Sequence, residues 1–337
     1  MNDLRHTWPL GAFPWLGTEP RPKPGIRVII DNDFAGDPDD LFQLAHHLLS
    51  PAVEIRSIIG SHLRPGDGFH PGPGSAAAGV EKAAELLAVM GLDAADALVP
   101  GSELALHDRT TPQRSPATAA IIAEAHRDDP RPLFVVCGGG LTDIASAYLI
   151  DPSIARRLTV AWIGGPEYPG TAYPPPGVTG PEYNLGIDPV AAQVVFNDSD
   201  LPLWQVPRDA YRRCLVADIE LRERVAPAGP LGAHLYQALR HVDATLRAEA
   251  LGYPATYALG DSPLVLLTAL QSYFDPDPSS SEYGLRPAPR FDEHGALTER
   301  RDGRPIRVYT RIDNRLMFED LFLKLRAFHR WQTERDY

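Results

Sequence analysis

The sequence contains little cysteine, and it has neither a long apolar run nor a long basic run. Its two cysteines, Cys137 and Cys214, allow at most one disulfide. Because Cys137 falls in an apparent buried strand, we expect two reduced structural thiols instead. The segment Met1–Lys23 lacks the apolar core of a signal peptide, and no segment approaches the length of a membrane span. These absences favour a soluble, cytoplasmic protein.

The chain also lacks an excess of positive charge, since its 337 residues carry a formal net charge of -12. This balance disfavours non-specific binding to nucleic acid through phosphates, and it disfavours an anionic membrane surface for the same reason. It suits a cation as a partner, although acidic side chains also keep a protein soluble. The length is enough to bury a sizeable core in one large α/β domain or in two smaller domains.

Strand-like and helix-like patterns alternate through the first two-thirds of the chain. The strand-like runs are 28–30, 55–59, 133–137 and 158–163, and the helix-like runs are 41–49, 76–90, 116–126, 142–149 and 189–196. This alternation predicts parallel βαβ units with helices on both faces of a sheet. The last third is expected to contain helices at 218–225, 231–250 and 262–273, a loop at 275–281, a strand at 306–309 and a helix at 314–330.

Five aspartates fall within the ten residues 31–40, between the apolar run Val28-Ile29-Ile30 and a helix-like segment. The loop after the carboxyl end of a parallel strand is where ligands bind in open α/β sheets. Like charges this close repel each other unless a positive group neutralises them, and a hard cation such as Ca²⁺ or Mg²⁺ would do so. Capping of the following helix would account for one or two of these acids but not for five.

An EF-hand is one possible metal motif for this segment. Asp31, Asp33 and Gly36 match its first, third and sixth positions, but Ala35 and Phe42 stand at the fifth and twelfth positions, which require oxygen ligands. A strand also precedes the segment where an EF-hand requires a helix. We therefore exclude this motif.

A second possibility is a Mg²⁺-dependent phosphatase of the haloacid dehalogenase type. Asp31-Asn32-Asp33 resembles the start of its motif, in which the first aspartate is the nucleophile. Ala35 replaces the usual Thr or Val, and the three later aspartates have no obvious role in that scheme. This function stays open as an alternative.

Five segments in order along the chain match the motifs of another family. They are 31–40 with its Asp-x-Asp and paired Asp, Gly139-Gly140-Leu141-Thr142-Asp143-Ile144-Ala145, Trp162-Ile163-Gly164-Gly165, Glu182-Tyr183-Asn184-Leu185-Gly186-Ile187-Asp188-Pro189, and Asp261-Ser262-Pro263-Leu264. Together they resemble the inosine-uridine-preferring nucleoside hydrolase family over about residues 26–328. The resemblance implies an α/β fold with a mostly parallel central sheet flanked by helices. It implies one catalytic domain over 26–330, after an N-terminal extension of residues 1–25.

The same resemblance implies Ca²⁺-dependent hydrolysis of the N-glycosidic bond of a ribonucleoside or related riboside. Asp33, Asp40, Asp261 and the backbone carbonyl of Thr142 would hold the ion, and all are oxygen donors. Asp33 would also be the general base that takes a proton from the attacking water. Sugar hydroxyls would be bound by a further set, which is Asp39, Glu182 and Asn184. The family also implies a homo-oligomer.

The chain departs from the family around the leaving group. Gly260 stands where a histidine often precedes the late metal-binding aspartate, and residues 174–180 contain no asparagine. The general acid, if one is needed, comes from elsewhere; the candidates are His62, His70, Tyr183, Trp204, Tyr253 and Tyr257. A third possibility therefore stays open, namely a protein that binds nucleoside or sugar but has lost leaving-group activation.

Overall fold

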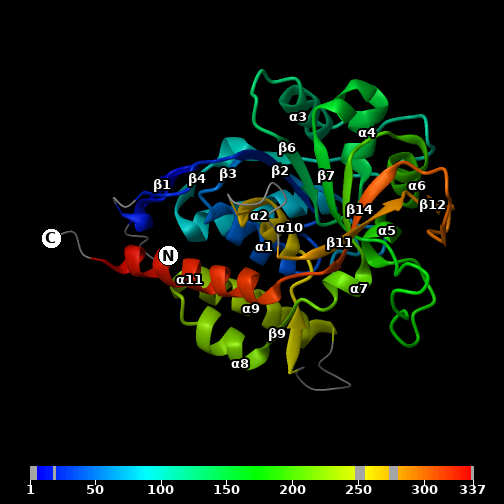
Figure 1. Cartoon of the computed structure of the whole chain (residues 1–337). Helices are drawn as coiled ribbons and strands as arrows, with labels where there is room; N and C mark the ends of the chain where they lie inside the picture. The colour runs from blue at the N-terminus through cyan, green and yellow to red at the C-terminus, as the bar shows by residue number, and fades with distance from the viewer. Residues whose placement is uncertain (1–5, 18–19, 247–254, 273–279, 335–337) are drawn as a thin grey trace.

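A computed structural model describes residues 6–17, 20–246, 255–272 and 280–334. Within these ranges the main sheet has eight strands in the order β11-β14-β8-β7-β6-β2-β3-β5, and β11 alone runs antiparallel to its neighbour (Figure 1). The strands are β2 (Ile26–Asn32), β3 (Val53–Gly60), β5 (Leu98–Pro100), β6 (Leu133–Cys137), β7 (Thr159–Ile163), β8 (Leu203–Val206), β11 (Glu282–Pro287) and β14 (Pro305–Arg311). The predicted α/β class with a mostly parallel central sheet is confirmed.

The central strand β2 pairs in parallel with β3 on one side and with β6 on the other. All seven of its residues are buried, as expected for a parallel strand covered on both faces. Val28 and Ile30 point into one hydrophobic cluster, while Ile29 points into the other. Because successive side chains of β2 point to opposite faces of the sheet, they pack against helices on both faces.

Helices cover both faces of this sheet (Figure 1). One hydrophobic cluster joins the sheet to α1 (Asp39–Leu48), α2 (Ser75–Met90), α9 (Gly229–Leu246), α10 (Pro263–Ala269) and α11 (Asn314–Thr333). The other joins it to α3 (Pro116–Ala125), α4 (Thr142–Ile150) and α6 (Pro189–Gln193). In the part of the chain that the structure describes, no helix is long and apolar enough to cross a membrane.

The remaining elements are short. They are β1 (Trp8–Pro9), β4 (Leu92–Asp93), α5 (Tyr183–Ile187), α7 (Arg208–Tyr211), β9 (Leu215–Ala217), α8 (Asp218–Glu220), β10 (Thr256–Ala258), β12 (Arg290–Phe291) and β13 (Leu297–Thr298), with 3₁₀ turns at 14–16, 95–97 and 152–156. Residues 6–17 pack onto the domain, because β1 pairs with β4 and the buried Trp8 ring meets Phe328 of α11 edge-on.

Most strands and helices in the first two-thirds of the chain lie where their patterns predict. In the main sheet the prediction misses β5 and β8, which are only three and four residues long, and the edge strand β11. The predicted helices at 189–196 and 218–225 are each an α-helix followed by a π-helical turn, at 194–198 and 221–225. The helix predicted at 262–273 is shorter, since α10 ends at Ala269. Residues 247–250, 273 and 275–279 of the predicted segments lie outside the described residues.

Candidate active site

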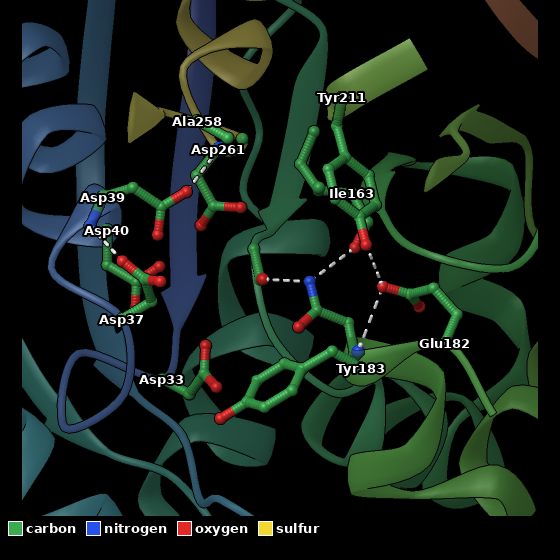
Figure 2. Close-up of a pocket in the computed structure, with 13 residues that line it drawn as sticks. Asp33, Asp37, Asp39, Asp40, Ile163, Glu182, Tyr183, Tyr211, Ala258 and Asp261 are labelled. Atoms are coloured by element: carbon green, nitrogen blue, oxygen red, sulfur yellow. Dashed lines mark hydrogen bonds between the residues drawn. The ribbon is translucent and has the colours of Figure 1, made fainter. Parts of the chain in front are cut away.

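A cavity of about 180 Å³ lies beyond the carboxyl ends of β2, β6 and β7. It is lined by Asp33, Asp37, Asp39, Asp40, Gly138, Ile163, Glu182, Tyr183, Asn184, Tyr211, Ala258, Gly260 and Asp261 (Figure 2). The chain passes from β2 to β3 on one side and later returns to place β6 on the other side of β2. The cavity therefore lies where the strand order reverses, which is the usual ligand site of an open α/β sheet.

Asp261 lies beside the acidic loop at the start of the chain, although more than two hundred residues separate them. Its backbone N–H donates to Oδ2 of Asp39 at 3.1 Å, and Nδ2 of Asn32 donates to its Oδ2 at 2.7 Å. Figure 2 shows Asp33, Asp37, Asp39 and Asp40 along one side of the cavity with Asp261 above them. The structure thus brings together the three carboxylates that the sequence selected as metal ligands, Asp33, Asp40 and Asp261.

The loop after β6 approaches these carboxylates so closely that only glycine fits. A Cβ atom at Gly138 would overlap Oδ2 of Asp261 and Oδ1 of Asn32, and a Cβ at Gly139 would lie 2.7 Å from Oδ1 of Asp33. The Gly138–Gly139 backbone therefore packs directly against Asp33 and Asp261. This explains why the family-like turn begins with glycines.

Burial and mutual repulsion disfavour the charged forms of these acids. Burial, and next the negative charge of Asp261, raise the pKa of Asp33 well above its usual range. Burial and then Asp33 do the same to the pKa of Asp40, whose Oδ2 is buried without a hydrogen-bond partner. Burial also raises the pKa of Asp261 to about 6. No lysine, arginine or histidine is among the described residues that line the cavity.

A hard cation fits this donor set. The carboxylates are oxygen ligands, one of their oxygens is buried without a partner, and their mutual repulsion would be relieved by positive charge. The described residues do not already form a ligand group, because no three His, Cys, Asp or Glu side chains converge as a metal's ligands do. The fit therefore rests on the charge and chemistry of the donors.

Glu182 lies across the cavity from the acids (Figure 2), and Asn184 lines the same cavity. Nδ2 of Asn184 donates to the carbonyls of Gly138, at 2.5 Å, and Ile163, at 2.8 Å. Both amide hydrogens are used, so its Oδ1 is the atom left to accept a hydrogen bond from a ligand. Glu182 caps the amino end of α5, where its carboxylate accepts backbone N–H groups including that of Leu185 at 3.0 Å.

Two tyrosines, Tyr183 and Tyr211, line the cavity, and a third, Tyr257, contacts one of its acids. The phenol of Tyr257 donates to Oδ1 of Asp37 at 2.7 Å, and the phenol of Tyr211 donates to Oε1 of Glu182 at 2.6 Å. The buried hydroxyl of Tyr183 has no hydrogen-bond partner and points toward Asp33 (Figure 2). Sequence reasoning named Tyr183 and Tyr257 but missed Tyr211, which lies in no recognisable motif.

Other residues selected from the sequence lie outside the cavity lining. The hydroxyl of Thr142 donates to Asp188 Oδ2 at 2.7 Å and contacts Nε2 of His62 at 2.8 Å. Nδ1 of His62 lies 3.0 Å from the carbonyl of Leu63, so both nitrogens of this ring are engaged. His70 contacts the carbonyl of Pro73. Neither histidine lines the cavity.

Two candidate acids remain, Trp204 and Tyr253. Trp204 packs edge-on against Phe134, with the guanidinium of Arg307 4.1 Å from its ring. Tyr253 lies outside the described residues. Among the described residues, therefore, no imidazole or indole group lines the cavity as a proton donor.

Asp31 does not face the cavity. Its side chain is fully buried, neither carboxylate oxygen has a hydrogen-bond partner, and burial together with Asp143 raises its pKa well above its usual range. A phosphatase of the haloacid dehalogenase type needs this residue as an accessible nucleophile. The structure therefore does not support that alternative.

The fold and the site define an α/β protein with an acidic cavity at the switch point of a parallel sheet. A family model described as inosine-uridine preferring nucleoside hydrolase matches residues 28–278. The chain belongs to this family.

Characterised relatives match only parts of the chain. It is 40% identical over 79 residues to an inosine-uridine preferring nucleoside hydrolase of Leishmania major, an alignment that covers 23% of this chain and 22% of that protein. It is 27% identical over 144 residues to a probable ribonucleoside hydrolase of Dictyostelium discoideum, with coverage of 43% and 40%. The chain thus aligns with less than half the length of these relatives.

Solved structures match over most of the chain. A plant nucleoside hydrolase superposes with a TM-score of 0.69 at 20% identity, covering 90% of this chain and 100% of that one. A purine-preferring ribonucleoside hydrolase from Gardnerella vaginalis gives a TM-score of 0.68 at 17% identity, with coverage of 90% and 99%. At this level of identity the comparison establishes the fold.

Proposed function

We propose that the protein is a Ca²⁺-dependent hydrolase that cleaves the N-glycosidic bond of a ribonucleoside or related riboside. The observation that carries this proposal is that Asp33, Asp40 and Asp261 line one cavity together with the sugar-binding candidates. Membership of the nucleoside hydrolase family and the names of the similar proteins support the same reaction.

Asp33, Asp40, Asp261 and the backbone carbonyl of Thr142 are the proposed ligands of the ion. When bound, Ca²⁺ supplies positive charge that offsets the repulsion among these carboxylates and polarises a water molecule. The unpartnered Oδ2 of Asp40 and the raised pKa values of Asp33 and Asp40 support this assignment.

Asp33 is the proposed general base. It takes one proton from a water molecule, whose oxygen forms a bond to the anomeric carbon while the bond from that carbon to the base nitrogen breaks. The electron pair of the broken bond stays on the leaving base. Positive charge develops on the sugar during this step, and the surrounding carboxylates, including Asp39 and Asp261, stabilise it.

In this proposal Asp39 and Asn184 bind the sugar directly, and Glu182 contributes to sugar binding through the groups that its carboxylate holds in place. Asn184 supports it most directly, because its two carbonyl contacts orient the amide and leave Oδ1 as an acceptor for a sugar hydroxyl. Asp39 lines the cavity between the acidic loop and Asp261. The partner is therefore a small-molecule nucleoside or riboside.

The leaving base departs near Tyr183, whose buried hydroxyl points into the cavity without a partner. Burial, followed by the charge of Asp33, raises the pKa of this phenol above its usual range, which makes it a hydrogen-bond donor and a poor source of a full proton. A base that leaves as an anion would then take its proton from solvent.

The test is release of reducing sugar from a panel of purine and pyrimidine ribonucleosides by the purified chain. We expect turnover of at least one of them, loss of turnover on chelation, and recovery when Ca²⁺ is added back. Full activity after exhaustive chelation would contradict the metal requirement. Tight binding of ribosides without sugar release would select the non-catalytic binding protein instead.

Three further properties stay predictions: the cytoplasmic location, the homo-oligomeric state, and the division into an extension of residues 1–25 and one catalytic domain over 26–330. Size-exclusion chromatography with light scattering tests the second. A variant that begins at residue 26 tests the third, since an independent catalytic domain would keep its activity.

A further inference from the structure

The carboxylate of Glu182 is already saturated with hydrogen bonds. Its Oε2 accepts from the backbone N–H groups of Gly165 at 2.7 Å and Leu185 at 3.0 Å. Its Oε1 accepts from the backbone N–H of Asn184 at 3.3 Å and from the phenol of Tyr211 at 2.6 Å. Two acceptor positions on each oxygen are thus filled. A substrate hydroxyl that approaches this end of the cavity does not find a free lone pair on Glu182.

Tyr211 lines the cavity next to Glu182 and fills one acceptor position of its carboxylate. It ends α7 and places its hydroxyl beside Glu182 on the side opposite the acidic loop (Figure 2). Burial and the charge of Glu182 raise the pKa of this phenol well above its usual range, so it keeps its proton. Its single hydrogen goes to Glu182, and its oxygen is left as an acceptor.

The absence of a side chain at Gly260 leaves room for this ring. A Cβ atom at Gly260 would lie 3.1 Å from Cδ2 of Tyr211 and 3.3 Å from Oδ2 of Asp39. The first distance is tighter than ordinary van der Waals contact, so a larger side chain here would displace the ring or the carboxylate. The glycine that replaces the family histidine is therefore matched to Tyr211.

We propose that Tyr211 is a specificity-determining residue that recognises the 5′-hydroxyl of the sugar by accepting a hydrogen bond from it. This inference rests on the proposed function. Ribose in a nucleoside has three hydroxyls, and in this proposal the vicinal pair lies at the carboxylates of Asp33, Asp39 and Asp40, which line the cavity as hydrogen-bond acceptors. The remaining hydroxyl then points to the opposite side, where Tyr211 lies. Glu182 acts through Tyr211 by fixing the direction of its O–H bond.

The experiment measures binding by calorimetry, with Ca²⁺ present and without turnover. The probes are 1,4-anhydroribitol and its 5-deoxy analogue, which are ribofuranose mimics without a base. We expect the wild-type chain to bind the 5-hydroxyl compound about fivefold or more tightly, the typical worth of one hydrogen bond. In Tyr211→Phe, which keeps the ring but loses the hydroxyl, this ratio should fall to about one.

Two further variants distinguish the loss of this hydrogen bond from a folding defect. Tyr257→Phe removes a similar buried phenol–carboxylate bond, to Asp37, and should keep the wild-type ratio. Gly260→Ala pushes on the ring of Tyr211 and should lower the ratio without removing the hydroxyl. A ratio that is unchanged in Tyr211→Phe, or that is already one in the wild type, overturns the inference.

These outcomes are distinct from failure of the proposed function. If the wild-type chain releases sugar from nucleosides but does not discriminate between the two mimics, only the role of Tyr211 is wrong. If it binds neither mimic and hydrolyses no nucleoside, the proposed function fails and the inference fails with it.

Discussion

Nδ2 of Asn32 donates a hydrogen bond to Oδ2 of Asp261 at 2.7 Å, across 229 residues of sequence. The other hydrogen of the same amide goes to Oε1 of Gln43 on α1, at 3.2 Å. Both acceptors are buried, so the amide is fixed from two sides. Asn32 ends β2 and thus ties the late aspartate to the strand that carries the early ones. Asn32 therefore helps to set the direction in which Asp261 presents its carboxylate.

Substitution of Asn32 by alanine should weaken Ca²⁺ binding. Loss of a hydrogen bond to a metal ligand typically reduces metal affinity by about 10–100-fold, because the ligand is no longer held in position. Calorimetric titration of the Ca²⁺-free chain with Ca²⁺ measures this effect directly. Asn197→Ala is a matched control: this asparagine bonds the backbone of Phe291, far from the cavity lining, and should leave the affinity unchanged. Equal affinities in wild type and Asn32→Ala would show that Asn32 does not position Asp261.

Substitution of Asp33 by asparagine separates its two proposed roles. The amide keeps an oxygen that can contact a cation, but it cannot accept a proton from water. We expect turnover to fall by about 10²–10⁴-fold, the usual contribution of a general base, while Ca²⁺ binding is only partly weakened. Initial rates of sugar release at saturating Ca²⁺ provide the measurement.

The control for Asp33 is Asp37→Asn in the same cavity. Oδ1 of Asp37 accepts from Tyr257 and from the backbone N–H of Asp39, so its role is to hold the loop. Its replacement should cost less than about tenfold in turnover, an effect expected when orientation changes but the base is intact. Normal turnover in Asp33→Asn would rule out Asp33 as the base.

Much of this arrangement could be predicted from the sequence. The apolar run at 28–30 and the aspartates after it identify both β2 and the loop that carries the site, because a buried parallel strand has a simple signature. Asp261 could be linked to that loop only through the family motif. No local pattern encodes a contact between residues so far apart, and the structure supplies it through Asn32 and Asp39.

Other features depend on tertiary packing that a single sequence does not express. Tyr211 lies on a helix of four residues outside any motif, and its role can be inferred only from its contacts with Glu182 and Gly260. The edge strand β11 has half-exposed and exposed residues, so it lacks the apolar run by which β2 is recognised. Asp31 looks equivalent to Asp33 in the sequence, but Asp31 lies within β2 and is buried, whereas Asp33 follows the end of the strand and lines the cavity.

Asp31 should tolerate replacement by asparagine. Its carboxyl is buried without a partner, and burial raises its pKa and so disfavours the charged form, which makes an uncharged amide of the same shape a close substitute. We expect a change in unfolding free energy within about 1 kcal/mol and turnover close to that of the wild type. Chemical denaturation and sugar-release assays test both. Complete loss of activity, together with phosphate release from an aryl phosphate by the wild type, would restore the phosphatase alternative.

His46 should make the protein less stable as the pH falls below 6.5. Its side chain is fully buried, and burial lowers its pKa from 6.5 to about 4, although Nε2 lies 2.7 Å from Oδ2 of Asp320. Lys324 bonds the same aspartate and opposes a second positive charge nearby, and His47 is the adjacent buried histidine. Between pH 6.5 and about 4 the unfolded chain therefore binds a proton at His46 that the folded chain does not.

This difference has a definite sign. The stability that comes from keeping His46 neutral is fully present above pH 6.5, is lost progressively as the pH falls toward about 4, and changes little below it. The loss amounts to about 3 kcal/mol over that window. His46→Gln keeps a polar group of similar reach without a titrating ring. Urea denaturation of both proteins between pH 7 and pH 4 should therefore show the free energy of unfolding falling more steeply in the wild type. Parallel curves would mean that His46 titrates alike in the folded and unfolded chains, and that carboxylates alone set the acid sensitivity.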